Sequence, residues 1–549
     1  MLITRCRGRL ALVLAVVGTV TAPLLAQAAS KDDPAPQVAR PTSAASGEEA
    51  LPGHLEKPGA GSLPMPLALP APGPKLRAVV ERDGFVSVQV NVDPDGANIP
   101  GDAANEPSIA VDPLAPNRMA IGWRQFDNVQ SDFRQAGVGY SLDGGRTWTF
   151  PDVLDRGVFR SDPVLDVDAE GLFYYYSLYY DELHDLLLCD TFRSQDAGGT
   201  WSGPTPAMGG DKAWVTIDRS GGIGHGNFYA SWSIASGCCG QRVFTRSTDH
   251  GLTYMEPMAF EMSPTWGTLA VGPDGALYVA GNMNLFTDVF VIARSDNAQD
   301  PDAVPTFDYS FVEMGGEQLI GEVPNPVGLI GQVWLVADIS EGPSRGNLYM
   351  LCSVDPPGPD PCDVHFVRSE DRGETWSEPV AVHSDDRNAW QWFATMSAAP
   401  DGRLDVVWVE SLASTNVNVG ELLYAYSDDG GVSWSQSSPV SPVFDSHLGF
   451  PVQRKIGDYY HMVSDDVGAH LAYAATFNGE EDVYYLRIGD YDCNANGVGD
   501  GEDLATDASR DCNANQIPDE CEVAAGTAHD VDGALEECVL ASDLVPIAS

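Results

Sequence analysis

Short runs of alternating apolar and polar residues recur along most of the chain, and each run is broken by a turn of Asp, Gly and Pro. One plan repeats: an apolar strand, the turn, and a second strand rich in Tyr, Val and Trp. Its seven copies read SIAVDPLAPNRMAIGW, VLDVDAEGLFYYYSLYY, WVTIDRSGGIGHGNFYASW, TLAVGPDGALYVAG, WLVADISEGPSRGNLYML, TMSAAPDGRLDVVWV and HMVSDDVGAHLAYAA. A period of two predicts antiparallel strands rather than helices.

A second motif, Ser-x-Asp-x-Gly-x-Thr-Trp, interleaves with these strand pairs. Its first copy places Ser141, Asp143, Gly145, Thr147 and Trp148 at the fixed positions, and related copies begin at 194, 247, 369 and 427, with a degenerate one after 293. Glycine adopts positive φ without steric cost, and the Asp, Ser and Thr side chains can bond to turn amides. The aromatic residue can pack beneath the sheet. The motif therefore predicts a structural turn rather than a catalytic site.

Together, each strand pair and motif turn make four antiparallel strands, the blade of a β-propeller. We predict an all-β propeller of seven four-stranded blades, with six as the alternative because the region 268–336 is irregular. The seventh unit, at 457–488, supplies only three strands. The alternating run at 85–92 is expected to add the fourth strand and close the ring.

The net charge of the chain limits which classes of partner we expect. The chain has 79 acidic and 30 basic residues, a formal net charge of -49. Such a surface repels phosphate backbones, so nucleic acid is not an expected partner. It suits the binding of calcium, or solubility in salty surroundings.

The N-terminal residues predict export. Arg5, Arg7 and Arg9 precede the apolar run LALVLAVVGTV and a small-x-small cleavage site, so residues 1–28 are interpreted as a signal peptide. Residues 29–80, rich in Pro, Ala and Gly, are interpreted as a disordered linker. No later apolar run approaches the ~18 residues that a membrane helix needs. We expect a secreted protein with no membrane span.

Export also predicts disulfides. Cys352 and Cys362 could close one hairpin, and Cys189 could meet Cys238 or Cys239. Removal of the signal peptide would leave an odd number of cysteines, so at least one thiol is expected to be free or paired between chains.

The five complete motifs resemble the Asp-box (BNR) repeats of the sialidase superfamily, over roughly residues 106–488. The resemblance implies a sialidase-like propeller domain at 81–489. It also implies candidate exo-α-sialidase or related glycoside hydrolase chemistry. In that chemistry an arginine cluster holds the substrate carboxylate, a tyrosine is the nucleophile, and acidic residues transfer protons.

Candidate residues for that chemistry fall in connections on the propeller face opposite the motif turns. They are Arg124, Arg160, Arg454, Glu106, Asp162, Asp211, Asp458 and Tyr459. The alternative is that the acidic residues are turn caps or line the channel. The protein would then be a non-catalytic propeller of a surface or extracellular assembly. Either interpretation predicts an extracellular glycan or glycoprotein as partner, and the second also allows a protein partner.

The C-terminal residues 490–540 contain two aligned loops, DCNANGVGDGED and DCNANQIPDECE. Oxygen atoms at positions 1, 3, 5, 7, 9 and 12 of such loops bind calcium. The predicted ligands are Asp492, Asn494, Asn496, Val498, Asp500, Asp503, Asp511, Asn513, Asn515, Ile517, Asp519 and Glu522. The spacing resembles dockerin and thrombospondin type 3 calcium repeats, in a small tail stabilised by disulfides and metal. The alternative is a disordered acidic tail.

Overall fold

The computed structural model describes residues 78–383, 388–413, 416–451, 454–525, 530–531 and 534–535. The predicted signal peptide, the predicted linker up to residue 77 and the last residues of the predicted tail domain lie outside the described residues.

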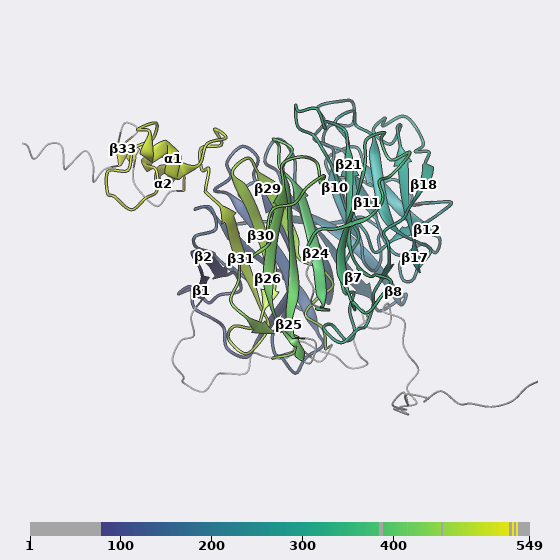
Figure 1. The fold of residues 1–549 in the computed structure, drawn as a ribbon, viewed down its shortest axis with the longest axis horizontal. Coiled ribbons are helices and arrows are strands. Elements are labelled where there is room, and N and C mark those ends of the chain that lie inside the picture. Colours follow the sequence, from purple (N-terminus) through teal and green to yellow (C-terminus); the bar gives the residue numbers. More distant parts are fainter. Residues whose placement is uncertain are drawn as a thin grey trace, which may run out of the picture. The chain divides into compact units, whose positions relative to one another are not determined.

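The described strands of the main domain form seven antiparallel sheets, the blades of a β-propeller (Figure 1). Blade one contains β3 (Ala103–Val111), β4 (Met119–Phe126) and β5 (Arg134–Ser141). Blade two contains β6 (Arg160–Val167), β7 (Phe173–Asp181), β8 (Leu186–Ser194) and β9 (Ser202–Pro206). Blade three contains β10 (Trp214–Ile217), β11 (Phe228–Ser231), β12 (Arg242–Ser247) and β13 (Met258–Ala259).

The next three blades follow the same order. Blade four contains β14 (Pro264–Thr265), β15 (Leu269–Val271), β16 (Leu277–Met283), β17 (Phe286–Ser295) and β18 (Asp308–Val312). Blade five contains β19 (Glu317–Gln318), β20 (Trp334–Ala337), β21 (Leu348–Asp355), β22 (Asp363–Ser369) and β23 (Val380–Ala381). Blade six contains β24 (Gln391–Ala398), β25 (Leu404–Ala413), β26 (Asn416–Ser427), β27 (Ser438–Pro439) and β28 (Phe444–Asp445).

Blade seven combines the two ends of the domain. Its strands are β29 (His461–Asp465), β30 (Gly468–Ala475), β31 (Asp482–Gly489), β2 (Phe85–Gln89) and β1 (Val79–Arg82). The predicted closing strand is confirmed, because Val88 of β2 is the partner of Tyr485 in β31. Strand β1, which the sequence did not predict, pairs with the outer side of β2.

The ring closes at seven blades. The inner strands contact one another in one cycle that runs β3, β6, β10, β15, β20, β24 and β29, and β29 contacts β3 again. These strands are the seven apolar segments that the sequence pattern singled out. Buried Tyr, Trp, Val and Ala side chains of adjacent blades fill the space between the sheets. This confirms seven blades over six.

The repeated motif forms the same turn in each complete copy. In the first, Oδ1 of Asp143 accepts hydrogen bonds from Ser141 Oγ at 2.7 Å and from the backbone N of Thr147 at 2.9 Å. Its Oδ2 accepts from Thr147 Oγ1 at 2.6 Å. Gly145 has φ of 84°, and a Cβ there would lie 2.2 Å from the ring of Tyr485 in the neighbouring blade. The Asp carboxylates of the other four copies accept the same bonds.

The expected disulfides of the propeller are wrong. Cys189, Cys352 and Cys362 are buried free thiols, and Cys238 is instead bonded to its neighbour Cys239. Adjacent cysteines need no long-range register to meet, whereas the spacing of distant cysteines says nothing about their separation in space. The vicinal disulfide lies in the connection between β11 and β12, where Cys238 N bonds to the carbonyl O of Gly209.

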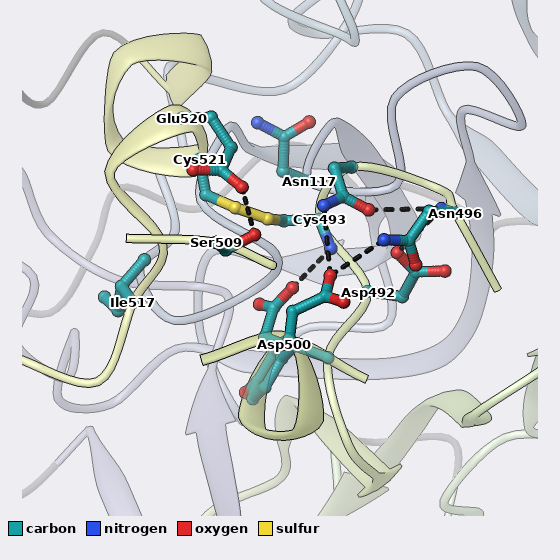
Figure 2. The surroundings of a disulfide bond; sticks show 12 residues. Asn117, Asp492, Cys493, Asn496, Asp500, Ser509, Ile517, Glu520 and Cys521 are labelled. Atoms are coloured by element: carbon teal, nitrogen blue, oxygen red, sulfur yellow. Dashed lines mark hydrogen bonds between the residues drawn. A yellow bond between two sulfur atoms is a disulfide. The ribbon is translucent and has the colours of Figure 1, made fainter. Parts of the chain in front are cut away.

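The tail after residue 489 contains helix α1 (Asp500–Ala505) and helix α2 (Asp519–Ala525), with the short strands β32 (Asp530–Val531) and β33 (Ala534–Leu535). A disulfide joins Cys493, in the segment before α1, to Cys521 in α2 (Figure 2). Among the described residues, no helix has the length and apolarity to cross a bilayer.

Candidate functional site

The inner ends of several blades carry β-bulges where the chain enters the first strand. The register between β3 and β4 shifts after Asn105, and that between β6 and β7 shifts after Ser161. At these bulges Glu106 has φ of 56° and Asp162 has φ of 44°, and Lys212 before β10 has φ of 54°. Left-handed backbone costs non-glycine residues on the order of 1–3 kcal/mol each, so surrounding contacts must hold it in place.

Carboxylates from three blades meet around one lysine at this end of the channel. Nζ of Lys212 lies 3.1 Å from Oδ1 of Asp211 and 2.8 Å from Oδ2 of Asp458. It lies 4.0 Å from Oδ2 of Asp162, an oxygen that also accepts the backbone N–H of Lys212 at 2.8 Å. A second lysine, Lys455, places its Nζ 2.5 Å from the same Oδ2 of Asp458.

A fourth carboxylate, Glu106 of blade one, is held by an arginine. Nε of Arg124 lies 2.9 Å from Oε2 of Glu106 and donates to Oδ1 of Asn105 at 2.9 Å. Nζ of Lys455 lies 3.9 Å from the same Glu106 oxygen. The buried network therefore unites five residues that the sequence singled out: Glu106, Arg124, Asp162, Asp211 and Asp458.

A loop at 319–333, between β19 and β20, packs against this network. The backbone N of Leu329 donates to Oδ1 of Asp458 at 2.8 Å. Nδ2 of Asn325 donates to the carbonyl O of Gly457 at 2.8 Å, and Oδ1 of Asn325 accepts from the backbone N of Ile456 at 3.1 Å. Asp458 consequently has no solvent-exposed surface. In this conformation the network is part of the closed interior.

Tyr459 lies beside the network, with its hydroxyl engaged elsewhere. The hydroxyl donates to the carbonyl O of Pro163 at 2.7 Å. Burial, reinforced by the carboxylate of Glu106, raises the pKa of Tyr459 well above its usual range. Burial also raises the pKa of Glu106 to about 8, although the charge of Arg124 opposes that shift. Ionisation of the tyrosine is therefore strongly disfavoured.

The other two arginine candidates have different surroundings. Nη2 of Arg160 pairs with Asp155 at 2.9 Å and with Asp190 at 2.8 Å, and its guanidinium lies over the ring of Phe192. Arg454 is solvent-exposed. Within the part of the chain that the structure describes, Arg124 is the one of these three arginines that pairs with a carboxylate of the network.

Sequence reasoning missed the two lysines that organise the network. Lysine is rare in this chain, and Lys212 and Lys455 each stand next to or near a predicted acidic residue at the start of an inner strand. A rare lysine beside an acidic residue at the start of an inner strand is the sequence feature that could have identified both. Asn325 was missed because its loop was not assigned to this face.

A cavity of about 340 Å³ lies at the other end of the channel, lined by the later residues of the inner strands. The rings of Trp214 and Trp334 meet there with centroids 5.2 Å apart, and His461 stacks on Trp334 at 5.6 Å. Nδ1 of His461 accepts the backbone N–H of Ile109, so the neutral ring carries its proton on Nε2. Burial lowers the pKa of His461 to about 3. Most of the other lining residues are apolar, and the polar ones are Asp166, Thr216, Arg219, Thr268, Ser397 and Ser464.

The two tail loops have matching hydrogen bonds, and Figure 2 shows part of the first. Oδ1 of Asp492 accepts from the backbone N of Asn496 at 3.1 Å, and Nδ2 of Asn496 donates to Asp503 Oδ2 at 2.8 Å. In the second loop Oδ1 of Asp511 accepts from the backbone N of Asn515 at 3.0 Å, whose Nδ2 reaches Glu522 at 2.8 Å.

In both loops the side chain at position 9 accepts a hydrogen bond from the backbone N–H of the cysteine at position 2. Oδ1 of Asp500 accepts from the backbone N of Cys493 at 2.9 Å, and Oδ1 of Asp519 accepts from that of Cys512 at 2.9 Å. Hydrogen bonds thus tie the side chains of positions 1, 5, 9 and 12 into the same local structure in both loops.

Comparison with known proteins gives no match to any family model and none to a curated protein. Solved structures do match. A protein of unknown function from Dyadobacter fermentans DSM 18053 is 12% identical, with a TM-score of 0.42 over 75% of this chain and 100% of that one. Phage phi92 endosialidase is 10% identical, with a TM-score of 0.40 over 74% and 69%. Trypanosoma rangeli sialidase is 12% identical, with a TM-score of 0.36 over 76% of this chain and 60% of the sialidase.

Proposed function

We propose that the protein is a secreted Asp-box propeller that binds extracellular glycans or glycoproteins without cleaving them. The observation that carries this proposal is the state of the charged residues at the candidate catalytic end. Glu106 is paired with Arg124, and Asp458 is paired with Lys212 and Lys455, all in the protein interior. Charged groups that neutralise one another hold the blades together and offer nothing to a substrate carboxylate.

The central cavity is the proposed glycan site. Its lining is largely apolar and includes the edges of the mostly buried Trp214 and Trp334 rings, and apolar surface of this kind can contact the apolar face of a sugar ring. The hydroxyl of Thr216, which is half-buried beside the cavity, can exchange hydrogen bonds with a sugar hydroxyl. Its volume, about 340 Å³, is within the range of small-ligand sites.

A sialidase-type hydrolase is the second candidate function, because Glu106 and Arg124 lie next to Tyr459 in one buried cluster. For catalysis the loop at 319–333 would have to leave the network. The tyrosine hydroxyl would also have to exchange Pro163 for a carboxylate that accepts its proton.

One set of assays separates the two functions. Full-length protein is tested for release of sialic acid and of fluorogenic sugars from several glycosides, and for binding on a glycan array. The expected result is binding without release. Ala398→Trp, which fills the cavity, should abolish binding, whereas Ala235→Trp at an exposed position should not. Release that is lost in Glu106→Gln and Asp458→Asn would favour the hydrolase instead.

We also propose that each tail loop binds one calcium ion. The shared hydrogen-bond pattern of the two loops supports this, as does the spacing of oxygen-bearing side chains at positions 1, 3, 5, 9 and 12. The tail is too short and polar to be stabilised by burial alone, so calcium and the disulfide at Cys493 would supply its stability.

A further inference from the structure

A second group of carboxylates, of which Asp102 and Asp482 are buried and Glu480 is half-buried, lies where the ring closes, away from the lysine network. Asp102 directly precedes β3 of blade one, and Asp482 is the first residue of β31 in blade seven. Glu480 stands two positions before Asp482. The N-terminal segment that closes the ring also reaches this point, because Nδ2 of Asn91 donates to Asp102 Oδ2 at 3.3 Å and to Asp482 Oδ1 at 2.9 Å.

The three carboxylates are close enough to share one ion. One oxygen from each of Asp102, Glu480 and Asp482 lies within 4.8 Å of the other two. Calcium binds oxygen atoms at about 2.3–2.6 Å, so ligands on opposite sides of the ion are about 5 Å apart. The oxygen atoms therefore fit within a single coordination sphere.

No basic side chain compensates this charge. Among the described residues, no lysine, arginine or histidine forms an ion pair with Asp102, Glu480 or Asp482. The side chains of Asp102 and Asp482 are both 0% exposed. Neutral amides bond to some of their oxygen atoms, with Nε2 of Gln125 donating to Asp102 Oδ2 at 2.8 Å. The lysine network differs in this respect, because there each acidic residue has a cationic partner.

One oxygen in the group has no partner at all. Oδ1 of Asp102 is buried and accepts no hydrogen bond. A buried carboxylate oxygen without donor or cation is costly, since desolvation is not offset by any contact. Burial and the neighbouring acids raise the pKa of Asp102, and burial raises that of Asp482 to about 7. Either protons or a cation must neutralise the group.

We propose that Asp102, Glu480 and Asp482 bind one calcium ion, which ties the closing segment of the ring to blades one and seven. A ligand set made only of oxygen atoms favours calcium over zinc or copper. Bound calcium would neutralise two of the three negative charges and occupy the unpartnered oxygen of Asp102. The ion would stabilise the one junction of the ring that joins two distant parts of the sequence.

The test counts calcium ions on the full-length chain after the tail loops are disabled by Asp503→Asn and Glu522→Gln. Equilibrium dialysis with radioactive calcium should then find one ion per chain. Adding Asp102→Asn and Asp482→Asn, which keep the shape of the side chains, should weaken that binding at least tenfold. As a matched control, Asp338→Asn changes another buried carboxylate and should retain the ion. No bound calcium up to millimolar concentration in the tail-disabled chain would overturn the proposal.

A second measurement does not alter the carboxylates and so avoids any failure of the variants to fold. Hydrogen exchange of the amides at 86–90 is compared with and without calcium in the tail-disabled protein. Calcium should slow exchange in this closing segment at least tenfold more than in β12. Equal exchange with calcium and with a chelator would also overturn the proposal. Neither measurement depends on glycan binding, so its outcome is independent of the proposed function.

Discussion

Nζ of Lys212 lies 2.8 Å from Oδ2 of Asp458 and joins blade three to blade seven across the closed end of the channel. Both side chains have 1% or less of their surface exposed. The pair links blades that are not adjacent in the ring, so it restrains the width of the channel as well as the two strands. Lys212 also lies within ion-pair distance of Asp211 and Asp162, so three carboxylates share this one cation.

Replacement of this lysine should destabilise the propeller strongly. Lys212→Met removes the positive charge but keeps most of the side-chain volume, so it takes away the cation that Asp162, Asp211 and Asp458 share. Breaking a buried pair in this way typically costs about 3–5 kcal/mol. Urea denaturation measures the loss. Arg345→Met, at an exposed ion pair with Glu341, should change stability by less than about 1 kcal/mol. Equal effects of the two variants would contradict a restraining role for Lys212.

The turn motif should matter for folding and not for ligand binding. Asp143→Ala removes acceptors for Ser141 and Thr147, so we expect a loss of about 1–3 kcal/mol in the free energy of unfolding. Denaturation of this variant beside Glu378→Ala, at an exposed position, checks the expectation. Unchanged stability together with lost glycan binding would mean that the motif has a direct functional role.

Local patterns predicted the fold well because the interactions that define a blade are local in the chain. The alternation of Val88 and its neighbours marked the closing strand, and its pairing with Tyr485 is confirmed. Asp143 could be interpreted as a turn residue because all its partners lie within four positions. Strand β1 was missed because its short segment, Val79–Arg82, follows a run rich in Pro, Ala and Gly.

The site could be predicted only in part, because its contacts join distant blades. Glu106 and Asp458 stand at the starts of inner strands, so the sequence placed both on one face of the propeller. In the structure both lie beside Lys455. Sequence does not give distances between blades, so it did not show that Arg160 meets Asp190 instead of this network. The carboxylates at the ring closure were missed for the same reason, since Asp102 and Asp482 lie near opposite ends of the domain's sequence although they are close in space.

The ring-closure group should make stability depend on pH in the absence of calcium. The folded-state pKa of Asp482 is raised to about 7, above the unfolded value of about 3.9, so the folded state binds more protons between these values. Stability should therefore fall as the pH rises from about 4 to about 7, by a few kcal/mol at most. Calcium should oppose this loss, because the ion replaces the protons.

Thermal unfolding of the tail-disabled chain from pH 5 to pH 8 checks this expectation. The difference in melting temperature between calcium and a chelator should widen as the pH rises. In Asp482→Asn, which has no carboxyl to titrate there, the widening should be much smaller. A constant difference across this range would mean that Asp482 does not exchange protons for calcium.

The tail offers a comparison between two nearly identical loops. Asp503→Asn changes position 12 of the first loop and Glu522→Gln changes that of the second. At each site the variant keeps an oxygen but loses the negative charge that attracts the cation. Asn496 donates to Asp503, and Asn515 donates to Glu522, so the two substitutions perturb equivalent contacts. We expect each single variant to lose one calcium ion per chain and the double variant to lose two.

The consequence for structure should differ between the loops. The first loop contacts the propeller, where the guanidinium of Arg146 lies 3.7 Å from the centroid of the Tyr491 ring and 3.6 Å from Oδ2 of Asp500. Asp503→Asn should therefore expose the junction at residues 489–491 to proteases, whereas Glu522→Gln should increase cleavage only after residue 510. Proteolysis with and without calcium, followed by mass spectrometry of the fragments, measures both. If the two variants gave identical fragments, or if cleavage were the same with and without calcium, the loops would not order the tail through bound metal.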